Sequence, residues 1–501
     1  MRVLALAAGV FLALAGCSRQ ADVSVGSKAF TESVILGEIA THLAEDAGYS
    51  VEHINFPGTR LAWNALIAGD IDVYPDYTGT IIQETLFSEN LKTDAEVNAA
   101  LAAHGIRMSR PLGFENAYAI GMREKLAEQL GIRTISDLKR HPGLRLGFSS
   151  AFMERDDGWK PLRERYALPH QDVTGLEHAL AYQALDSDSI QVTDLYLTDA
   201  ERMLYDLRVL EDDLRYFPNY DAVWLYREDL ETRAPEFVAA LKSLEGKISE
   251  SEMIAMNART QIDKVAETKV AADFLAEELR VESEVIEETL AQRVWRYTLD
   301  HVFLVGWSLL AAILVSLPLG VLAARSSSAG QVILGIAGVI QTIPAIALLV
   351  VLISPLNELG FRGIGTPPAL VALFLYSLLP IVRNTHAGLK DVSPQLVESA
   401  SALGLSPWAR LRLVELPIAA RTILAGIKTA AVINVGFATL GGFIGAGGYG
   451  EPIFAGIRRA DYSLILEGAI PAAALAILVQ LTFELVERSV VPKGLRLKAE
   501  G

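Results

Sequence analysis

The stretch DVYPDYTGT, residues 72–80, combines side chains that are suited to binding a small charged molecule. It follows the apolar ALIAGDI and places Tyr74 and Tyr77 three residues apart, each near an acidic residue, with Thr80 ending a Thr-Gly-Thr turn. The face of a tyrosine ring attracts cations, and a threonine hydroxyl donates hydrogen bonds. A tyrosine at a strand end is more often partly buried packing. The stretch therefore indicates a site only if other elements bring similar side chains to the same place.

The order of the expected elements around this stretch is typical of an α/β fold. Alternating strands and helices predict a largely parallel sheet. A second series begins near residue 119 and has strands that end in Ser149-Ser150 and in IQVTDLYLTD. Because open α/β sheets bind ligands beyond the carboxyl ends of their strands, these polar and aromatic ends are expected to line one site. The first series comprises strands at residues 23–30, 51–56 and 71–77 and helices at residues 32–47 and 60–68.

The composition divides the chain into two parts. The chain has 501 residues, which is more than one hydrophobic core organises. Apolar residues make up 51% of it and charged residues 21%, a composition that fits neither a wholly soluble protein nor one embedded throughout in a membrane. Residues 301–501 hold 14 Lys and Arg against 10 Asp and Glu, so a charge of +4 there leaves −20 for residues 1–300, given the total of −16. An acidic, solvated module joined to a membrane part explains these figures, and no basic footprint for nucleic acid is present.

The N-terminus is typical of an exported protein. Met1 and Arg2 precede an apolar run that ends in LAGC, and Cys17 is the only cysteine. Residues 1–17 indicate a secretory signal whose cleavage site resembles the lipobox of bacterial lipoproteins, in which the cysteine is acylated. A plain signal sequence with an incidental cysteine is the alternative. An apolar run of about 14 residues is too short for a retained membrane helix, and one cysteine excludes a disulfide framework or a cysteine-based metal site.

Five apolar segments after residue 301 predict an all-α membrane domain. Four are long enough to cross about 30 Å of hydrocarbon, and the third is short unless it extends back to residue 364. If the acidic half is exported, five crossings place the loop at residues 383–421, with its five basic residues, in the cytoplasm, as the positive-inside rule prefers. Arg458 and Arg459 then lie on the outer side, against that rule. The segments are residues 302–324, 332–353, 368–382, 423–444 and 464–486.

The loop contains ESASALGLSPWARLRLVELP, residues 398–417, which resembles the EAA loop of ABC importer permeases. In that family an acidic residue and two small residues are followed by a glycine six places after the acid and by a Leu-Pro pair. The loop forms a short helix that docks on the ATPase subunit. Small residues permit close approach, and a glycine permits a tight turn; a solvated amphipathic helix is the alternative. The matching residues are Glu398, Ser399 in place of the usual alanine, Ala400, Gly404, Leu416 and Pro417.

Other parts of the membrane half resemble permeases of the glycine betaine/choline uptake subfamily. They are QTIPAIALL (341–349), LYSLLPIVRNT (375–385) and IGAGGYGEPIFAGI (444–457). The last contains G-x-G-x-x-G, but it follows a membrane helix rather than a strand, so a glycine-rich re-entrant bend is expected instead of a dinucleotide site. No G-x-x-x-x-G-K-[ST] motif occurs in the sequence. The resemblance therefore implies a separate ATPase subunit and a pair of permease units.

The exported half resembles the substrate-binding proteins of the same osmoprotectant-uptake family over about residues 23–279. The resemblance implies a two-lobe α/β periplasmic-binding-protein-like (type II) domain at residues 22–290, followed by an all-α transmembrane ABC permease domain of about five helices at residues 295–490. Lobe one is expected to take about residues 23–118 and 222–290, and lobe two about residues 119–221. Six motifs carry the resemblance, in the family's order and with similar spacing: GSKAFTES (26–33), PDYTGT (75–80), ENAYAI (115–120), FMERDDGW (152–159), DLYLTDA (194–200) and EDDLRYFPNY (211–220).

One end of the implied ligand site is an aromatic box. A quaternary ammonium has no N–H to donate, so a protein holds it by surrounding it with electron-rich aromatic faces. Tyr74 is expected to pack within the lobe instead. The residues that the motifs assign to the box are Tyr77, Tyr118, Tyr196 and Tyr220.

At the other end, the resemblance assigns a ligand carboxylate to Lys28, Thr80 and Arg155. Two unpaired cations would be costly to enclose, so they would require an anionic group, and the planar guanidinium suits a carboxylate. A structural salt bridge of Arg155 with Asp156 or Asp157 is the alternative.

We therefore expect a receptor–permease subunit of an ATP-driven ABC importer in the bacterial cytoplasmic (inner) membrane, with the substrate-binding domain on the outer side. Glycine betaine is the leading ligand. Choline, carnitine or another trimethylammonium compound is the alternative within the class, and a membrane-tethered sensor or enzyme is the alternative from another class. No catalytic constellation or metal-ligand spacing is apparent, and no cofactor is expected. The expected partners are the solute, a separate ABC ATPase subunit, a second copy of the permease and the membrane, with no nucleic acid.

Overall fold

The computed structural model describes residues 21–86, 93–155, 158–281, 283, 285, 288–459 and 461–491. The chain forms two compact units. One holds Ala21–Glu287 with Gly456–Asp461, and the other holds Glu288–Ala455 and the chain from Tyr462 onward. They are called the binding unit and the membrane unit below. The expected signal segment with Cys17, and Asp156 and Asp157, lie outside the described residues.

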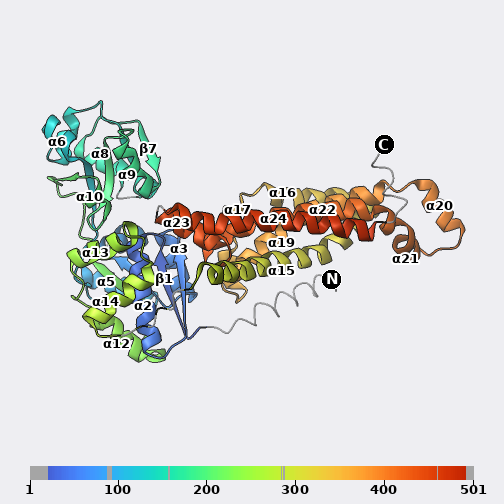
Figure 1. The fold of residues 1–501 in the computed structure, drawn as a ribbon, viewed down its shortest axis with the longest axis horizontal. Helices are drawn as coiled ribbons and strands as arrows, with labels where there is room; N and C mark the ends of the chain where they lie inside the picture. The colour runs from blue at the N-terminus through green and yellow to red at the C-terminus, as the bar shows by residue number, and fades with distance from the viewer. Residues whose placement is uncertain are drawn as a thin grey trace. The chain divides into compact units, whose positions relative to one another are not determined.

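The binding unit contains two five-stranded mixed sheets in separate lobes, which Figure 1 shows with their helices. In the first sheet β1 pairs in parallel with β2 and β3, whereas β10 is antiparallel to β3 and β4. In spatial order the strands are β2 (Val51–Phe56), β1 (Val23–Lys28), β3 (Val73–Tyr77), β10 (Ala222–Arg227) and β4 (Ile106–Met108).

The second sheet repeats this plan. Strand β6 pairs in parallel with β7 and β8, and β5 is antiparallel to β8 and β9. In spatial order the strands are β7 (Val173–Leu176), β6 (Leu146–Ser149), β8 (Val192–Tyr196), β5 (Tyr118–Arg123) and β9 (Leu207–Leu210). The expectation of a largely parallel sheet is therefore only half right. Strands β5 and β10 each follow a crossing of the chain from the other lobe, and each enters its new sheet from the opposite end.

Helix α2 (Thr31–Asp46) is the central helix of the first lobe and explains why the start of that lobe is buried. Twelve of its 16 residues are buried, and the helix packs against β1 and against helices α13 and α14. The whole first turn belongs to this buried part. Glu32, in that first turn, is therefore removed from solvent.

The remaining elements of the binding unit cover the two sheets. The first lobe contains α3 (Thr59–Ala68), α4 (Thr78–Thr80), η1 (Ile81–Thr85), α5 (Asp94–Ala103), α11 (Leu230–Arg233), α12 (Pro235–Ser243), α13 (Glu250–Gln261) and α14 (Glu267–Glu278). The second contains α6 (Glu124–Leu130), η3 (Ile135–Arg140), α7 (Ser150–Glu154), α8 (Trp159–Tyr166), α9 (His178–Asp186) and α10 (Glu201–Leu204).

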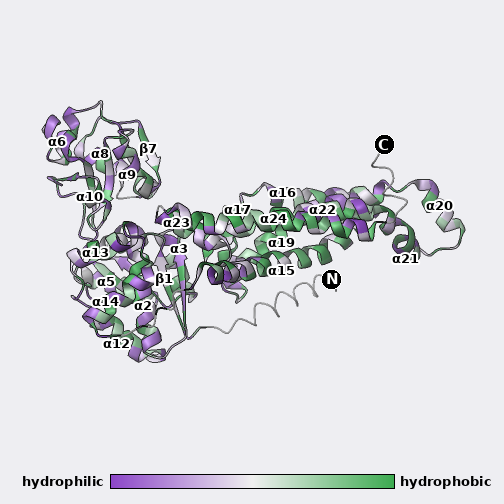
Figure 2. Cartoon of the chain, in the orientation of Figure 1, coloured by the Kyte–Doolittle hydropathy of each residue, from purple (hydrophilic) through white to green (hydrophobic). Residues whose placement is uncertain are grey.

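Within the described part of the membrane unit, four helices are long and apolar enough to cross a membrane, or five if one bent pair counts as a span. Figure 2 shows hydrophobic residues dominating α15, α19 and α24. The candidate spans are α15 (Leu290–Arg325), the bent pair Ser327–Thr342 and Ala345–Glu358, α19 (Thr366–Lys390), Pro407–Ile444 and α24 (Tyr462–Val490).

The second expected span, residues 332–353, is not one straight helix. Helix α16 (Ser327–Thr342) ends before Pro344, and the pair formed with the following helices α17 (Ala345–Val351) and α18 (Ile353–Glu358) is bent by 98°. Proline has no N–H to donate and disfavours helical geometry in the residue before it, and Ile343 is extended. Hydropathy alone could not reveal this break.

The shorter elements of the membrane unit lie around Pro407–Ile444 and before α24. They are α20 (Pro394–Ala402), α21 (Pro407–Arg410), η4 (Leu411–Glu415), α22 (Leu416–Ala438), η5 (Thr439–Ile444) and α23 (Gly450–Arg458). The glycine-rich stretch joins η5 to α23 through tight backbone packing: a Cβ on Gly450 would lie 1.8 Å from the carbonyl oxygen of Thr439. Glycine at such a position allows two backbone segments to pack closer than any side chain would permit.

Candidate ligand-binding site

Four tyrosines from separate elements converge in the binding unit. Tyr77 ends β3, Tyr118 begins β5, Tyr196 ends β8 and Tyr220 precedes β10. The ring of Tyr118 lies 4.8 Å from that of Tyr196 and 5.9 Å from that of Tyr220, between centroids. Phe30 links Tyr77 to this group, because its ring is 6.2 Å from Tyr77 and 5.9 Å from Tyr196. These five residues are called the aromatic cluster below.

Strand pairing brings the cluster together. Tyr118 and Tyr196 are direct partners in the second sheet, and their hydroxyl oxygens are 3.1 Å apart. In the first sheet Tyr77 is paired with Ala222, two residues after Tyr220. The ends of β3 and β8 are carboxyl ends, where ligands of α/β sheets bind. The polar and aromatic strand ends that were expected to line one site thus lie close together in the fold.

The turn after β3 fits the ring of Tyr220 closely. A Cβ added to Gly79 would lie 2.6 Å from two ring carbons of Tyr220, so a larger residue would displace the ring. Thr80, next in the turn, is buried. Tyr74 is fully buried, and its hydroxyl donates to Asp76 at 2.8 Å, as a residue packed within the lobe should.

Both expected cations of the site are paired with carboxylates, which contradicts the premise that they are unpaired. Lys28 Nζ donates to Asp76 Oδ1 at 2.7 Å in a buried pair. Arg155 Nη1 donates to Glu84 Oε2 at 2.8 Å, and these two residues come from different lobes. The sequence argument failed because Asp76 and Glu84 lie 48 and 71 residues away along the chain.

The same cations lie over two of the tyrosine faces. Lys28 Nζ is 4.8 Å from the ring centroid of Tyr77, and the guanidinium carbon of Arg155 is 5.0 Å from that of Tyr118. Cation–π geometry requires a cation within about 6 Å of the centroid. The faces of Tyr77 and Tyr118 are therefore arranged so that each accommodates a positive group.

Glu32 is a residue of the site that the sequence argument missed. Its carboxylate accepts from the hydroxyl of Tyr77, from Asn116 Nδ2 at 2.8 Å and from Asn257 Nδ2 at 3.2 Å. Burial raises the pKa of Glu32, and the hydrogen bonds oppose that rise. Asn257 Nδ2 also donates to the backbone oxygen of Thr198 in the second lobe, at 2.9 Å, so this network spans both lobes. Four of its five members, all except Asn257, lie within the quoted motifs, and those motifs were the available signal.

Asp199 and His178 hold Tyr196 from the second lobe. Asp199 Oδ2 accepts from the backbone N–H of Tyr196 at 2.8 Å, from His178 Nε2 at 3.0 Å and from the hydroxyl of Tyr182. The ring of His178 lies 4.6 Å from that of Tyr196. Burial favours neutral His178, but the charges of Asp199 and Asp194 outweigh it and raise the pKa of His178 to about 9.

The EAA-like loop of the membrane unit ends its helix with a glycine turn. Helix α20 carries Glu398, Ser399 and Ala400, of which Ala400 alone is buried. Gly404 has φ +80°, and the N–H groups of Gly404 and Leu405 donate to the carbonyls of Ser401 and Ala400. This is the Schellman arrangement that closes a helix with a left-handed residue.

Large apolar side chains are exposed around this turn. Leu403 is 82% exposed, Trp408 69% and Leu413 62%. Buried Glu415, just before Leu416 and Pro417 at the start of α22, accepts from Arg410 Nε at 2.9 Å and pairs with Arg325. The loop is thus fixed at its base while its apolar tip is uncovered, a combination typical of an interaction surface.

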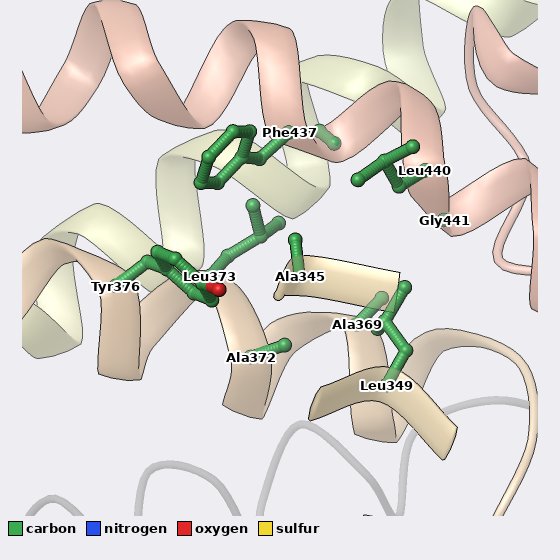
Figure 3. Close-up of a pocket in the computed structure, with 10 residues that line it drawn as sticks. Ala345, Leu349, Ala369, Ala372, Leu373, Tyr376, Phe437, Leu440 and Gly441 are labelled. Atoms are coloured by element: carbon green, nitrogen blue, oxygen red, sulfur yellow. The ribbon is translucent and has the colours of Figure 1, made fainter. Parts of the chain in front are cut away.

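A small apolar pocket lies in the membrane unit where α17, α19 and η5 meet (Figure 3). Tyr376 and Phe437, which both line it, make an edge-to-face contact with ring centroids 4.9 Å and ring planes 89° apart. The hydroxyl of Tyr376 donates to the backbone oxygen of Ile343 at the α16–α17 bend. The tyrosine thereby satisfies a carbonyl that the break in the helix leaves without a helical partner.

Two family models match this chain. One, described as the substrate binding domain of an ABC-type glycine betaine transport system, matches residues 21–277, and the other, a binding-protein-dependent transport system inner membrane component, matches residues 316–493. A glycine betaine/carnitine/choline transport system permease protein of Bacillus subtilis (strain 168) is 40% identical over 197 residues, which is 39% of this chain and 88% of the relative.

Two further similarities concern the other half of the chain. A glycine-betaine-binding protein of Pseudomonas aeruginosa is 34% identical over 294 residues, which is 55% of this chain and 94% of the relative. A solved structure of a glycine betaine/carnitine/choline ABC transporter aligns over 52% of this chain and 100% of its own, with 28% identity and a TM-score of 0.45.

The two units thus define a transport protein of the ABC class, in which a substrate-binding domain and a permease domain form one chain. The chain belongs to the family of ABC-type glycine betaine transport substrate-binding domains, fused to a binding-protein-dependent inner membrane component. This confirms the expected family and the expected fold class, a two-lobe α/β domain followed by about four to five apolar helices.

Proposed function

We propose that the protein is the receptor–permease subunit of an ATP-driven importer for glycine betaine. The observation that carries this proposal is the convergence of Tyr77, Tyr118, Tyr196 and Tyr220 at strand ends of both sheets, with Arg155 beside them. Each cation–π contact contributes about 0.5–2 kcal/mol to binding. Several tyrosine faces together therefore support micromolar affinity, even after the entropy lost by ordering the ligand and the side chains. The curated relatives named for glycine betaine support the same solute.

Arg155 is the proposed contact for the carboxylate of the solute. It already binds a carboxylate, that of Glu84, at 2.8 Å, and its side chain is largely buried. Because a charged, planar fork binds a carboxylate with two donors, the solute can exchange with Glu84 at this position. Lys28 and Thr80 are proposed to complete that end of the site.

Choline is the second candidate, and the pairing of both cations favours it. Since Lys28 and Arg155 are compensated by Asp76 and Glu84, a ligand without a carboxylate leaves no bare charge in the site. Carnitine or another trimethylammonium compound belongs to the same class. A tethered sensor is disfavoured by the match of residues 316–493 to a transport component.

Calorimetry on the purified full chain separates these ligands. We expect glycine betaine to bind at least about tenfold more tightly than choline, and Arg155→Ala to remove most of that preference while choline affinity changes little. Glu128→Gln, an exposed change on α6, serves as the control. Equal or tighter choline binding by the native chain would overturn the betaine assignment and leave choline as the solute.

The membrane half is proposed to work with partners. The exposed apolar tip of the EAA-like loop is proposed to dock on a separate ATPase subunit, and two permease units are proposed to pair, with the loop in the cytoplasm and the binding unit outside. Residues 22–290 and 295–490 are the proposed working domains, and Cys17 is the proposed lipid anchor. Edman or mass analysis of the mature N-terminus tests the last point, because an unmodified Met1 would contradict it.

A further inference from the structure

A second cavity lies between the lobes of the binding unit and shares only Phe30 and Tyr196 with the aromatic cluster. Its other walls come from the start of α2, the end of α13, and the segments around α9 and α10. It adjoins the proposed solute site through Phe30, Glu32 and Tyr196, whereas Lys28, Thr80 and Arg155 take no part in its lining. Its lining includes the carboxylates of Glu32, Glu177, Asp199 and Glu201, beside apolar surface from residues such as Ala29 and Phe30.

Several of these oxygens are deeply buried and have no partner in the described structure. Thr31 is 3% exposed, Asn116 5% and Asn257 3%. Both asparagines donate their side-chain N–H groups to Glu32, at 2.8 and 3.2 Å. Their side-chain carbonyl oxygens are therefore the atoms that are left without a hydrogen-bond partner. The unpartnered acceptors at this cavity are Thr31 Oγ1, Asn116 Oδ1, Asn257 Oδ1, Gln261 Oε1 and Glu201 Oε2.

Two cationic side chains line the cavity. His178 donates to Asp199 at 3.0 Å, and Arg458, in the segment that clusters with this unit, pairs with Glu267 at 3.1 Å, whereas His178 Nδ1 and Arg458 Nε have no hydrogen-bond partner among the described residues. Burial and the charge of Asp199 raise the pKa of Glu201 to about 7. Because the five unpartnered acceptors outnumber these two donors, and buried acceptors without donors are costly, the arrangement favours an occupant that is positive and binds oxygen.

We propose that this cavity binds a small monovalent cation through oxygen ligands, either ammonium or an alkali-metal ion. A quaternary ammonium does not fit this role, because its methyl groups donate nothing to carbonyl and carboxylate oxygens. A divalent ion is disfavoured, because among the described residues no three His, Cys, Asp or Glu side chains are placed to hold a metal ion. The two cation sites are thus chemically complementary: aromatic faces for a cation without donors, and oxygens for a small one.

The test measures the Tm of the full chain in detergent without any solute, so it is independent of the proposed function. Ammonium chloride and potassium chloride are titrated at constant ionic strength against N-methyl-D-glucamine chloride. The cavity predicts a saturable rise in Tm with ammonium, potassium or both, and the lower half-saturating concentration identifies the preferred ion. A Tm that is the same in all three salts would overturn the proposal.

Two mild substitutions assign the effect to this cavity. Thr31→Val keeps the shape and removes the hydroxyl, and Gln261→Met removes an amide from the end of α13. Each is expected to raise the half-saturating cation concentration about fivefold. Gln183→Met, at an exposed position of α9, is the matched control and should change nothing. A saturable effect that persists unchanged in both variants would contradict the assignment.

Discussion

At the scale of single residues, carboxylates of the protein occupy the places that a zwitterionic solute would need. Glu84 binds Arg155 across the two lobes, and Asp76 binds Lys28 within the first lobe. The Lys28 pair is buried on both sides, whereas Glu84 keeps about a fifth of its side chain in solvent. We therefore propose that Glu84 is the carboxylate that the solute displaces, and that its charge competes with the solute for Arg155.

Removing that competitor should strengthen betaine binding. We predict that Glu84→Gln lowers the Kd for glycine betaine by up to about fivefold, because a partly exposed ion pair is worth up to about 1 kcal/mol. Choline, which has no carboxylate, should gain little. Calorimetry on the full chain measures both, with Glu128→Gln as control, and weaker betaine binding by Glu84→Gln would contradict the competition.

His178 predicts how stability depends on pH. Its pKa lies near 9 in the fold against an ordinary value of 6.5. A raised pKa means that the protonated form stabilises the fold, so the contribution is complete below about pH 6.5 and is lost as pH rises through about 9. We expect the Tm of the native chain to fall more between pH 7 and pH 10 than that of His178→Gln. Parallel Tm profiles of the two proteins would show that His178 does not carry this charge.

At the scale of elements, the loop between α19 and α22 is built to present a surface. Gly404 closes α20 in a left-handed turn, and a Cβ added there meets nothing within 4 Å. A bulky residue at Gly404 would strain the turn itself, so loss of transport in Gly404→Leu would not prove a clash with a partner. Leu403, which is largely exposed beside the turn, is a sharper probe.

We predict that Leu403→Asp reduces solute-stimulated ATP hydrolysis at least about tenfold in the assembled transporter, because it removes an apolar contact and buries a charge. Solute binding to the same variant should be unchanged. Leu180→Asp, at a leucine on α9 of the binding unit that is 50% exposed, is the control. Full stimulated hydrolysis by Leu403→Asp would mean that the loop tip does not contact the ATPase.

The sequence predicted elements better than the contacts between distant residues. Strand β2 was expected at the residues where it lies, because its apolar pattern and its boundaries are local. The bend at Pro344 and the pairing of Arg155 with Glu84 were missed. The first depends on a single proline within a stretch that is apolar enough on average to predict a span, and the second on a contact between lobes that local patterns do not encode.

At the scale of the whole molecule, the chain joins a receptor and a permease that occur in separate relatives. The match at residues 21–277 and the match at residues 316–493 cover different units, and each curated relative corresponds to one of them. The charge asymmetry of the sequence already separated these halves. We propose that the aromatic cluster, where strand ends from both sheets meet, determines which solute the receptor binds.

Binding of glycine betaine should be compared with binding of glycine by calorimetry on the purified full chain. The two ligands carry the same charges and differ in three methyl groups, so the comparison isolates the aromatic box from the carboxylate end. The trimethylammonium group of glycine betaine is weakly hydrated and has no N–H group that needs an acceptor, so aromatic faces suit it. We therefore predict that glycine betaine binds at least about tenfold more tightly than glycine. Equal or tighter binding of glycine would contradict the assignment of Tyr77, Tyr118, Tyr196 and Tyr220 as a quaternary-ammonium site.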